Sequence, residues 1–210
     1  MSIWYRALYR IGLTPWEEDP QGPTANQIGT LFTREEESRP PSERQALDLG
    51  CGSGIWSVVL ASRGWQVTGV DIVPQAIRRA RARAAGAGVD ARFIQGDVTA
   101  LRTLGIQPGF RFLLDLECFN HLSEEQRAAV GEEVTAVAAP DATMLMLVWV
   151  PGRRGPLPPG ASRAELEAAF SDWSVIAEDA YANASALPSW VRNAKPRFYR
   201  LQRNPGDGHK

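Results

Sequence analysis

The amino-acid sequence predicts an α/β protein built on a doubly wound, mostly parallel sheet of seven strands that ends in an antiparallel hairpin. From residue 45 onward, short apolar runs alternate with helix-sized segments, which is the pattern of parallel strands covered by helices. A glycine-rich stretch at 50–54 joins the first such run to a helical pattern. Two late runs, 173–178 and 198–203, have no helix-sized segment clearly between them, and this predicts the hairpin.

The first part of the chain has a different character from the rest. Two short helices are expected there, at 3–11 and 25–32, on either side of a loop that contains three prolines. Residues 33–44 are highly charged and contain Pro40 and Pro41, so they predict a linker into the core. The expected organisation is an N-terminal helical arm that forms a lid at 1–44, a core at 45–203 and a flexible tail at 204–210.

Within the core, each strand can be placed by its apolar run. The run at 110–116 is continuous, which suits a strand buried on both faces. Pro74 fits the first turn of a helix, where its missing N–H costs nothing, and Ser123 and Ser162 each begin a capping box. Strands are expected at 46–49, 67–70, 91–94, 110–116, 143–150, 173–178 and 198–203, with helices at 55–63 and 74–85, from Ser123, and from Ser162 to about residue 170.

Composition excludes several classes of protein. The formal net charge is −1, which gives no whole-molecule field to attract nucleic acid or an anionic membrane. The chain has no stretch of about 20 apolar residues, and its N-terminus lacks the apolar region of a signal peptide. Its two cysteines, Cys51 and Cys118, are expected to be free thiols, which favours a reduced, cytoplasmic protein. No metal site is expected.

The glycine loop carries the strongest functional signal. Gly50, Gly52 and Gly54 allow a sharp turn and a close approach of a ligand to the backbone, and the following helix offers free N–H groups to a carboxylate or phosphate. The dinucleotide pattern G-x-G-x-x-G needs glycine or alanine where this chain has Ile55. Asp48 precedes the loop and suits a ligand with an ammonium group better than a pyrophosphate.

Two more acidic residues follow the next strands. Asp71, at the end of the second strand, can accept hydrogen bonds from both hydroxyls of a ribose. Asp97, after the third strand, can accept from an adenine amino group, and the Val98 backbone can supply a matching donor. Ribose recognition is shared with dinucleotide enzymes, so Asp71 alone identifies the sugar and not the cofactor.

These three motifs, in this order and at this spacing, resemble those of the class I S-adenosylmethionine-dependent methyltransferases over residues 46–203. The resemblance implies a Rossmann-like fold, S-adenosyl-L-methionine as methyl donor and S-adenosyl-L-homocysteine as product. It also implies that Asp48, Gly50 and Gly52 lie near the methionine portion. The full set of cofactor-binding residues expected is Trp16, Asp48, Gly50, Cys51, Gly52, Gly54, Asp71, Ile72, Gly96, Asp97, Val98 and Asp115.

A narrower resemblance concerns the methyl acceptor. The segments 15–23 and 114–122 are similar to the "PPWD-x-G-R-P" and "DRGCFHHL" stretches of small-molecule methyltransferases related to the thiopurine and quinone groups. Gln21 and Gly22 stand in place of Arg-Pro, Glu117 in place of a glycine, and Asn120 in place of a histidine. The resemblance implies a small-molecule acceptor that is methylated on oxygen, sulfur or nitrogen.

The segment after the fourth strand supplies the candidates to face the methyl group, namely Asp115, Glu117, Asn120 and His121. The predicted catalytic residues are Asp115, Glu117 and His121, with His121 as the base where the acceptor must lose a proton. Structural alternatives stay open: Asp115 as a helix cap, His121 as a helix-entry residue, and Trp16 as a staple and not a pocket wall. Trp149 suits substrate stacking or the core equally. The arginines at 78, 79, 81 and 83 are expected on a solvated helix face.

Three other functions compete with this one. An RNA, DNA or protein methyltransferase is disfavoured because the chain has no D-P-P-Y or N-P-P-Y element and no appended basic domain. A nucleotide-dependent oxidoreductase would use the same acidic residue at the end of the second strand. A non-catalytic protein that binds S-adenosylmethionine would bind the donor and turn over no acceptor.

Overall fold

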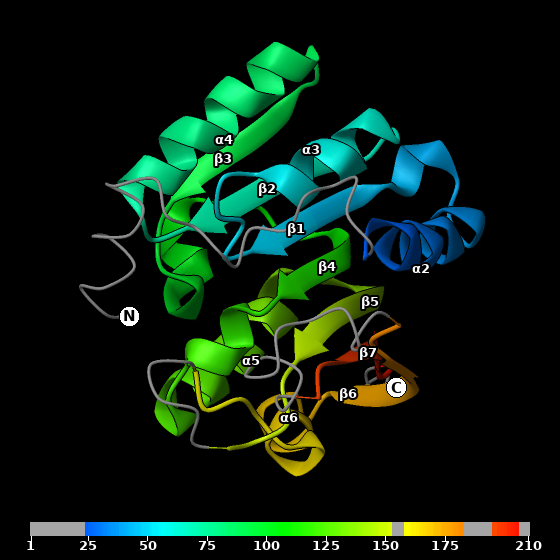
Figure 1. Ribbon diagram of the computed structural model, residues 1–210, viewed down its shortest axis with the longest axis vertical. Coiled ribbons are helices and arrows are strands. Elements are labelled where there is room, and N and C mark those ends of the chain that lie inside the picture. Colours follow the sequence, from blue (N-terminus) through cyan, green and yellow to red (C-terminus); the bar gives the residue numbers. More distant parts are fainter. Residues whose placement is uncertain (1–23, 153–157, 183–194, 206–210) are drawn as a thin grey trace, which may run out of the picture. The chain divides into compact units, whose positions relative to one another are not determined.

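The computed structural model describes residues 24–152, 158–182 and 195–205 (Figure 1). The helix expected at 3–11 and Trp16 lie outside these residues. The chain forms two compact units, Met1–Val98 and Thr99–Lys210. The strands take the order β3-β2-β1-β4-β5-β7-β6, which confirms the predicted seven-stranded, Rossmann-like sheet.

In the first unit, three parallel strands carry the glycine loop. They are β1 (Gln45–Leu49), β2 (Gln66–Asp71) and β3 (Ala91–Gln95), joined by α3 (Ile55–Ser62) and α4 (Pro74–Ala87). The register pairs Leu49 with Val70 and Asp71 with Gln95, so the carboxyl ends of the strands meet at one edge. That edge is where α/β folds bind their ligands. Figure 1 shows α4 running along β3. Ala80 and Ala84 of α4 belong to the same buried cluster as Phe93 of β3.

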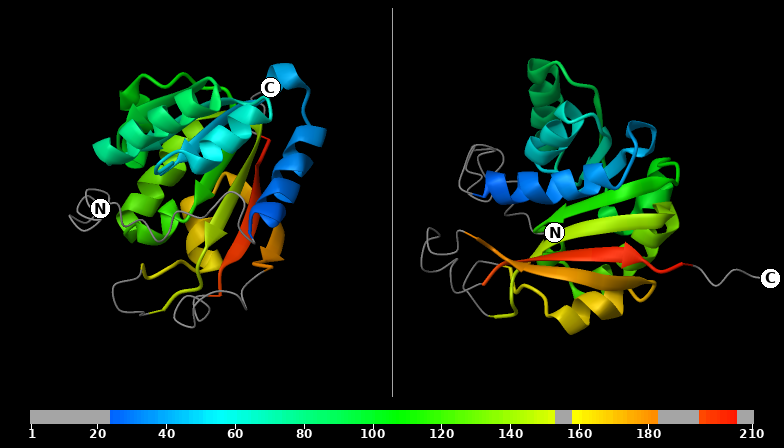
Figure 2. Two further views of the ribbon diagram at one scale, coloured as in Figure 1. Left: turned by 45° about the horizontal axis from the view of Figure 1, so that its top comes forward. Right: turned by 90° about the vertical axis from the view of Figure 1, so that its right-hand side faces the viewer.

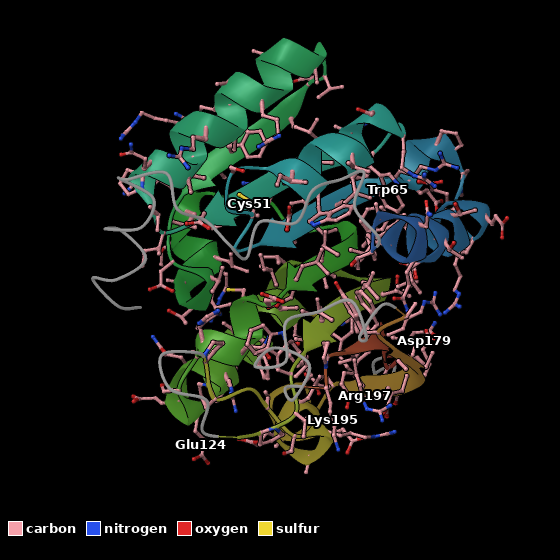
Figure 3. All side chains as sticks on the ribbon, viewed as in Figure 1. Cys51, Trp65, Glu124, Asp179, Lys195 and Arg197 are labelled. Carbon is pink, nitrogen blue, oxygen red and sulfur yellow. The ribbon has the colours of Figure 1, made fainter. Side chains whose placement is uncertain are left out.

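The helix α2 (Ala25–Glu37) is longer than the helix predicted at 25–32, so the linker predicted from residue 33 was wrong for its first five residues. Glu36, one of the charged residues in this segment, has partners within the first unit. Glu36 bonds the Arg63 guanidinium at 2.5 Å and accepts from the Trp65 indole at 3.3 Å. Figure 3 shows Trp65 beside α2, and a 3₁₀ turn, η1 (Pro41–Glu43), leads from there to β1.

The second unit contains the other four strands. The strand β4 (Phe110–Leu116) pairs in parallel with β5 (Ala138–Val148), while β7 (Arg197–Arg203) lies antiparallel between β5 and β6 (Trp173–Ala180). Figure 2 shows β6 and β7 as a long pair, which confirms the hairpin. The strand β5 begins and ends earlier than the strand expected at 143–150. Its beginning is earlier because α5 (Glu124–Val137) runs directly into it.

Local sequence signals set where the helices begin and end. Both predicted capping boxes are confirmed: the Ser123 hydroxyl accepts from the Gln126 N–H at 3.3 Å, and Ser162 begins α6 (Arg163–Ala169) in the same way. The helix α4 ends at Gly88, which adopts a left-handed φ of 66°. The 3₁₀ segments of the described part were not predicted, neither η1 nor η2 (Val98–Leu104) nor η3 (Cys118–His121). No helix in the described part is long and apolar enough to cross a membrane.

Close packing of α5 on α6 depends on a glycine. A Cβ atom built on Gly131 in α5 would lie 1.7 Å from the backbone oxygen of Ala169 in α6, far inside contact distance. Elsewhere in a helix, alanine is preferred to glycine by roughly 1 kcal/mol. At residue 131 the packing requirement outweighs that preference.

We therefore expect Gly131→Ala to lower the melting temperature, because the two helices must separate or shift to admit the methyl group. Thermal denaturation followed by circular dichroism measures the change, and a loss on the order of 2 kcal/mol is expected for an overpacked contact. Gly86→Ala in α4 is the matched control, since a Cβ there meets nothing within 4 Å. Stabilisation of the protein by both alanine variants would contradict this role of Gly131.

Candidate functional site

The glycine loop between β1 and α3 is held in a shape that side chains would prevent. Gly50, Gly52 and Gly54 have φ values of 67°, 53° and 75°, in the left-handed region that favours glycine. The Gly54 N–H donates to the Cys51 carbonyl at 2.9 Å and closes the turn. A Cβ on Gly54 would lie 2.8 Å from the Cβ of Ala80. The three glycines therefore bring the loop backbone to the edge of the sheet and let α3 pack against α4.

Asp71 braces this loop from the neighbouring strand. Its Oδ2 accepts from the Gly52 N–H at 3.0 Å, and its Oδ1 accepts from the Val73 N–H at 2.7 Å. Its own carbonyl accepts from the Gly96 N–H at 3.0 Å, so the segment after β3 is fixed to the end of β2. The structure thus brings together the three motifs that the sequence identified. The prediction for Asp71 covered a ribose contact and did not include this bracing role.

Asp48 is a buried carboxylate beneath the loop. Its side chain is 4% exposed, and its Oδ2 accepts from the Ser57 hydroxyl at 2.5 Å. Burial raises the pKa of Asp48 to about 7. The Ser57 hydrogen bond lowers this pKa, and the charge of Asp71 raises it further. Ser57 was not among the predicted site residues. Its position in the first turn of α3, directly after the loop, was the available signal.

An arginine holds the loop from the other side. The Arg83 guanidinium donates from Nε to the Ser53 carbonyl at 3.0 Å and from Nη2 to the Ser53 hydroxyl at 3.2 Å. Arg81 similarly donates to the Phe93 carbonyl at 2.8 Å. Both side chains are exposed, as expected for a solvated helix face, but their ends bind the backbone of neighbouring segments. Helical periodicity gave no sign of these bonds, which depend on tertiary contacts.

The remaining expected cofactor residues of the first unit lie at the same edge. Cys51 is a buried thiol in the loop (Figure 3), and its Sγ would be 2.9 Å from a Cβ on Gly69, which explains a glycine inside β2. Ile72, Gly96 and Asp97 are half-buried. Val98 is buried, at 6% exposed.

In the second unit, Asp115 lies near the end of β4 and is 1% exposed. Both of its carboxylate oxygens lie 3.1 Å from the Phe119 N–H, which donates to them. Asp115 therefore caps the short helix η3, the structural alternative raised for it from the sequence.

Glu117 occupies the position where the related motif has glycine, and the backbone explains that preference. Its φ is 78°, a left-handed conformation that is uncommon for a residue with a side chain. Its Oε1 accepts from the Trp149 indole N–H at 3.0 Å. The Trp149 backbone N–H donates to the Asn120 Oδ1 at 2.9 Å, and the Asn120 Nδ2 donates to the Leu147 carbonyl at 3.3 Å. Asn120 thus fixes the end of β5 from a fully buried position, and Trp149 is itself buried.

His121 ends η3, after Asn120. Burial lowers its pKa to about 4, so the imidazole is neutral at neutral pH. A neutral imidazole can accept a proton, but a base with so low a pKa binds that proton weakly.

The fold and the glycine loop define a Rossmann-like protein with a site for a nucleoside-containing ligand at the carboxyl edge of its parallel strands. Residues 46–141 match the sequence model of the family described as "Methyltransferase domain". Over this segment, which is less than half of the chain, the resemblance to the class I S-adenosylmethionine-dependent methyltransferases is confirmed.

Individual proteins show the same similarity. A ubiquinone biosynthesis O-methyltransferase of Idiomarina loihiensis is 37% identical over 83 residues, which are 39% of this chain and 33% of that protein. A 2-heptyl-1-hydroxyquinolin-4(1H)-one methyltransferase of Mycobacteroides abscessus is 31% identical over 104 residues, 49% of this chain and 45% of that protein. The chain thus spans less than half the length of these relatives.

Among solved structures, the N-methyltransferase NodS from Bradyrhizobium japonicum, in complex with S-adenosyl-L-homocysteine, superposes with a TM-score of 0.72. The match covers 95% of this chain and 97% of that one at 17% sequence identity. At this identity the likeness concerns the fold.

The raised pKa of Asp48 makes stability depend on pH. Because the folded-state value of about 7 lies above the ordinary 3.8, the folded protein holds this proton more tightly than the unfolded chain does. The free energy of unfolding therefore falls as pH rises from about 4 to about 7, by at most about 4 kcal/mol.

We expect Asp48→Asn to melt at a higher temperature than the wild type near pH 8, and by a smaller margin near pH 5. The amide removes the buried charge and still accepts from the Ser57 hydroxyl. Melting curves without ligand at both pH values measure the difference, with the exposed Asp90→Asn as the control. An equal margin at the two pH values would contradict the assignment of the buried charge to Asp48.

Proposed function

We propose that this protein transfers a methyl group from S-adenosyl-L-methionine to an oxygen, sulfur or nitrogen atom of a small molecule. The observation that carries the proposal is the glycine loop, bonded to Asp71 and lying over the buried Asp48, within a methyltransferase domain. The cradle fits this donor because it combines a backbone that approaches a ligand closely with carboxylates for a cationic amino acid and a ribose.

Each part of the donor has a partner in this proposal. Asp48 attracts the ammonium group, and N–H groups of the loop and of the first turn of α3 bind the carboxylate. Asp71 binds the ribose hydroxyls, and Asp97 with the Val98 backbone binds the adenine. Bound S-adenosyl-L-methionine supplies a methyl group on a sulfonium, which is electrophilic enough to need alignment more than activation.

The acceptor is proposed from the relatives. The names of two of them specify ubiquinone biosynthesis and a hydroxyquinolone. A second solved structure is a 1,6-didemethyltoxoflavin-N1-methyltransferase from Burkholderia thailandensis, matched at a TM-score of 0.69. These acceptors are small and ring-containing. A similar acceptor is proposed here, held beside the loop after β4 that carries Glu117 and His121.

The domain organisation also enters as a proposal. Residues 1–44 form an arm, 45–203 the catalytic core and 204–210 a tail. The part of the arm that the structure describes includes α2, which buries Ile28 and Phe32 and sets the Phe32 ring edge-on to Trp56 of α3 at 6.1 Å. This packing supports a fixed role for α2 within the first unit.

The cofactor is tested by calorimetric titration of the wild type and Asp71→Ala with S-adenosyl-L-methionine and S-adenosyl-L-homocysteine. We expect micromolar binding by the wild type, weakened by about 1–3 kcal/mol in the variant, because hydrogen bonds to a buried ligand are lost. Asp90→Ala, at an exposed carboxylate of the same unit, is the control. Binding of NAD(P) with no binding of either adenosyl compound would overturn the proposal. Tight donor binding with no turnover of any acceptor would favour a non-catalytic protein.

The role of His121 as base is tested once an acceptor is found by screening hydroxylated aromatics and amines for release of S-adenosyl-L-homocysteine. With its pKa lowered to about 4, His121 stays neutral through the neutral range. We therefore expect kcat to be independent of pH from about 5.5 to 8, and His121→Gln to lower kcat about 100-fold or more. His209→Gln, at the chain's other histidine, is the control. Unchanged turnover in His121→Gln would show that the acceptor needs no base at this position.

A further inference from the structure

The hydroxyl of a serine in the first turn of α3 has an unusual hydrogen-bond acceptor. Ser57 is fully buried, and its hydroxyl crosses from α3 to β1 to donate to the Oδ2 of Asp48 at 2.5 Å. The other serine of this helix, Ser62, donates instead to the Val58 carbonyl four residues earlier, at 2.9 Å. That local bond is the usual one for a helical serine. Ser57 thus joins the helix after the glycine loop to the acid before it.

We propose that Ser57 is a positioning residue for the methyl donor, which holds the Asp48 carboxylate oriented and ionised so that it can receive the ammonium group. The inference rests on the proposed function and deepens it. No part of the chemistry is assigned to Ser57 itself, because its hydroxyl proton is directed to Asp48.

The forces on Asp48 show why such a partner matters. Burial disfavours its charged form, and the carboxylate of Asp71 on the neighbouring strand disfavours it further. The Ser57 hydroxyl acts in the opposite direction. The nearby Arg83 guanidinium is bonded to Ser53 at the top of the loop, at 3.0 Å and 3.2 Å. Asp71 and Ser57 are therefore the groups in the described part of the first unit that act on the Asp48 charge.

Loss of the Ser57 hydroxyl would leave Asp48 protonated over a wider range of pH. A protonated carboxyl has no charge to offer an ammonium, so the donor must first displace the proton. Binding then weakens as pH falls below the pKa of Asp48, and releases a proton where Asp48 is protonated in the free protein. Both effects move to higher pH when the hydroxyl is removed.

The experiment is calorimetric titration with S-adenosyl-L-homocysteine at several pH values from about 5.5 to 8, in buffers of different ionisation enthalpy. For the wild type we expect Kd to rise as pH falls below about 7, with release of a proton. For Ser57→Ala we expect Kd to be about 10- to 100-fold higher near pH 6, as for the loss of a hydrogen bond to a charged group. The factor should shrink toward pH 8, and proton release should extend to higher pH than in the wild type.

Three variants make the result specific. Ser62→Ala removes the local helical hydroxyl and should leave both Kd and proton release unchanged. Ser57→Cys keeps the side-chain volume with a weaker donor, should give an intermediate pH dependence, and serves where Ser57→Ala does not fold. Asp48→Asn should bind weakly with no proton release.

A loss of affinity in Ser57→Ala by the same factor at every pH would overturn the inference, because it would show a purely structural role. Equal affinity and proton release in the wild type and Ser57→Ala would overturn it as well. Failure of the wild type to bind S-adenosyl-L-homocysteine at any pH would instead reject the proposed function, on which the inference rests.

Discussion

Burial of two neighbouring carboxylates, Asp48 and Asp71, is the constraint on which the first unit depends. A buried charge is costly unless it is hydrogen-bonded or paired. Asp71 meets this requirement with the N–H groups of Gly52 and Val73, and Asp48 with the hydroxyl of Ser57. The bonds that stabilise the charges therefore also fix the glycine loop. A ligand that brings a positive charge to Asp48 relieves the remaining cost, which favours a cationic donor over a pyrophosphate.

Sequence patterns could locate this unit because its structure is set by short-range signals. Strand ends and glycines have local geometric consequences, so β1 to β3 and the loop could be placed in advance, as could the two capping boxes of the second unit. The length of α2 could not, because Glu36 near its end bonds to Arg63 and Trp65, which are distant in sequence. Ser57 and Arg83 were missed for the same reason. Their partners are distant in sequence, and neither side chain differs locally from a structural or solvated one.

In the second unit, two residues depart from the family motif, and the structure gives a physical reason for the pattern at each. Glu117 replaces a glycine at a φ of 78°, so the glycine preference belongs to the backbone and not to a requirement for space. A side chain held in that conformation is strained by on the order of 1 kcal/mol or more. The bond from Trp149 to its carboxylate is a contact that glycine could not make. Asn120, the other departure, is fully buried and fixes the end of β5.

Donor and acceptor recognition therefore depend on different kinds of information. The proposed donor site is made largely of backbone groups at strand ends, and its supporting carboxylates have fixed positions relative to the glycines. The match to relatives follows the same division, since the family match ends at residue 141 and the curated relatives share only part of this chain. A loop such as the one at Glu117 can change its side chains without moving the strands that precede it. Relatives that share part of this scaffold are named for ubiquinone biosynthesis and for a hydroxyquinolone. The residues that depart from the family pattern are therefore the ones to examine for the acceptor.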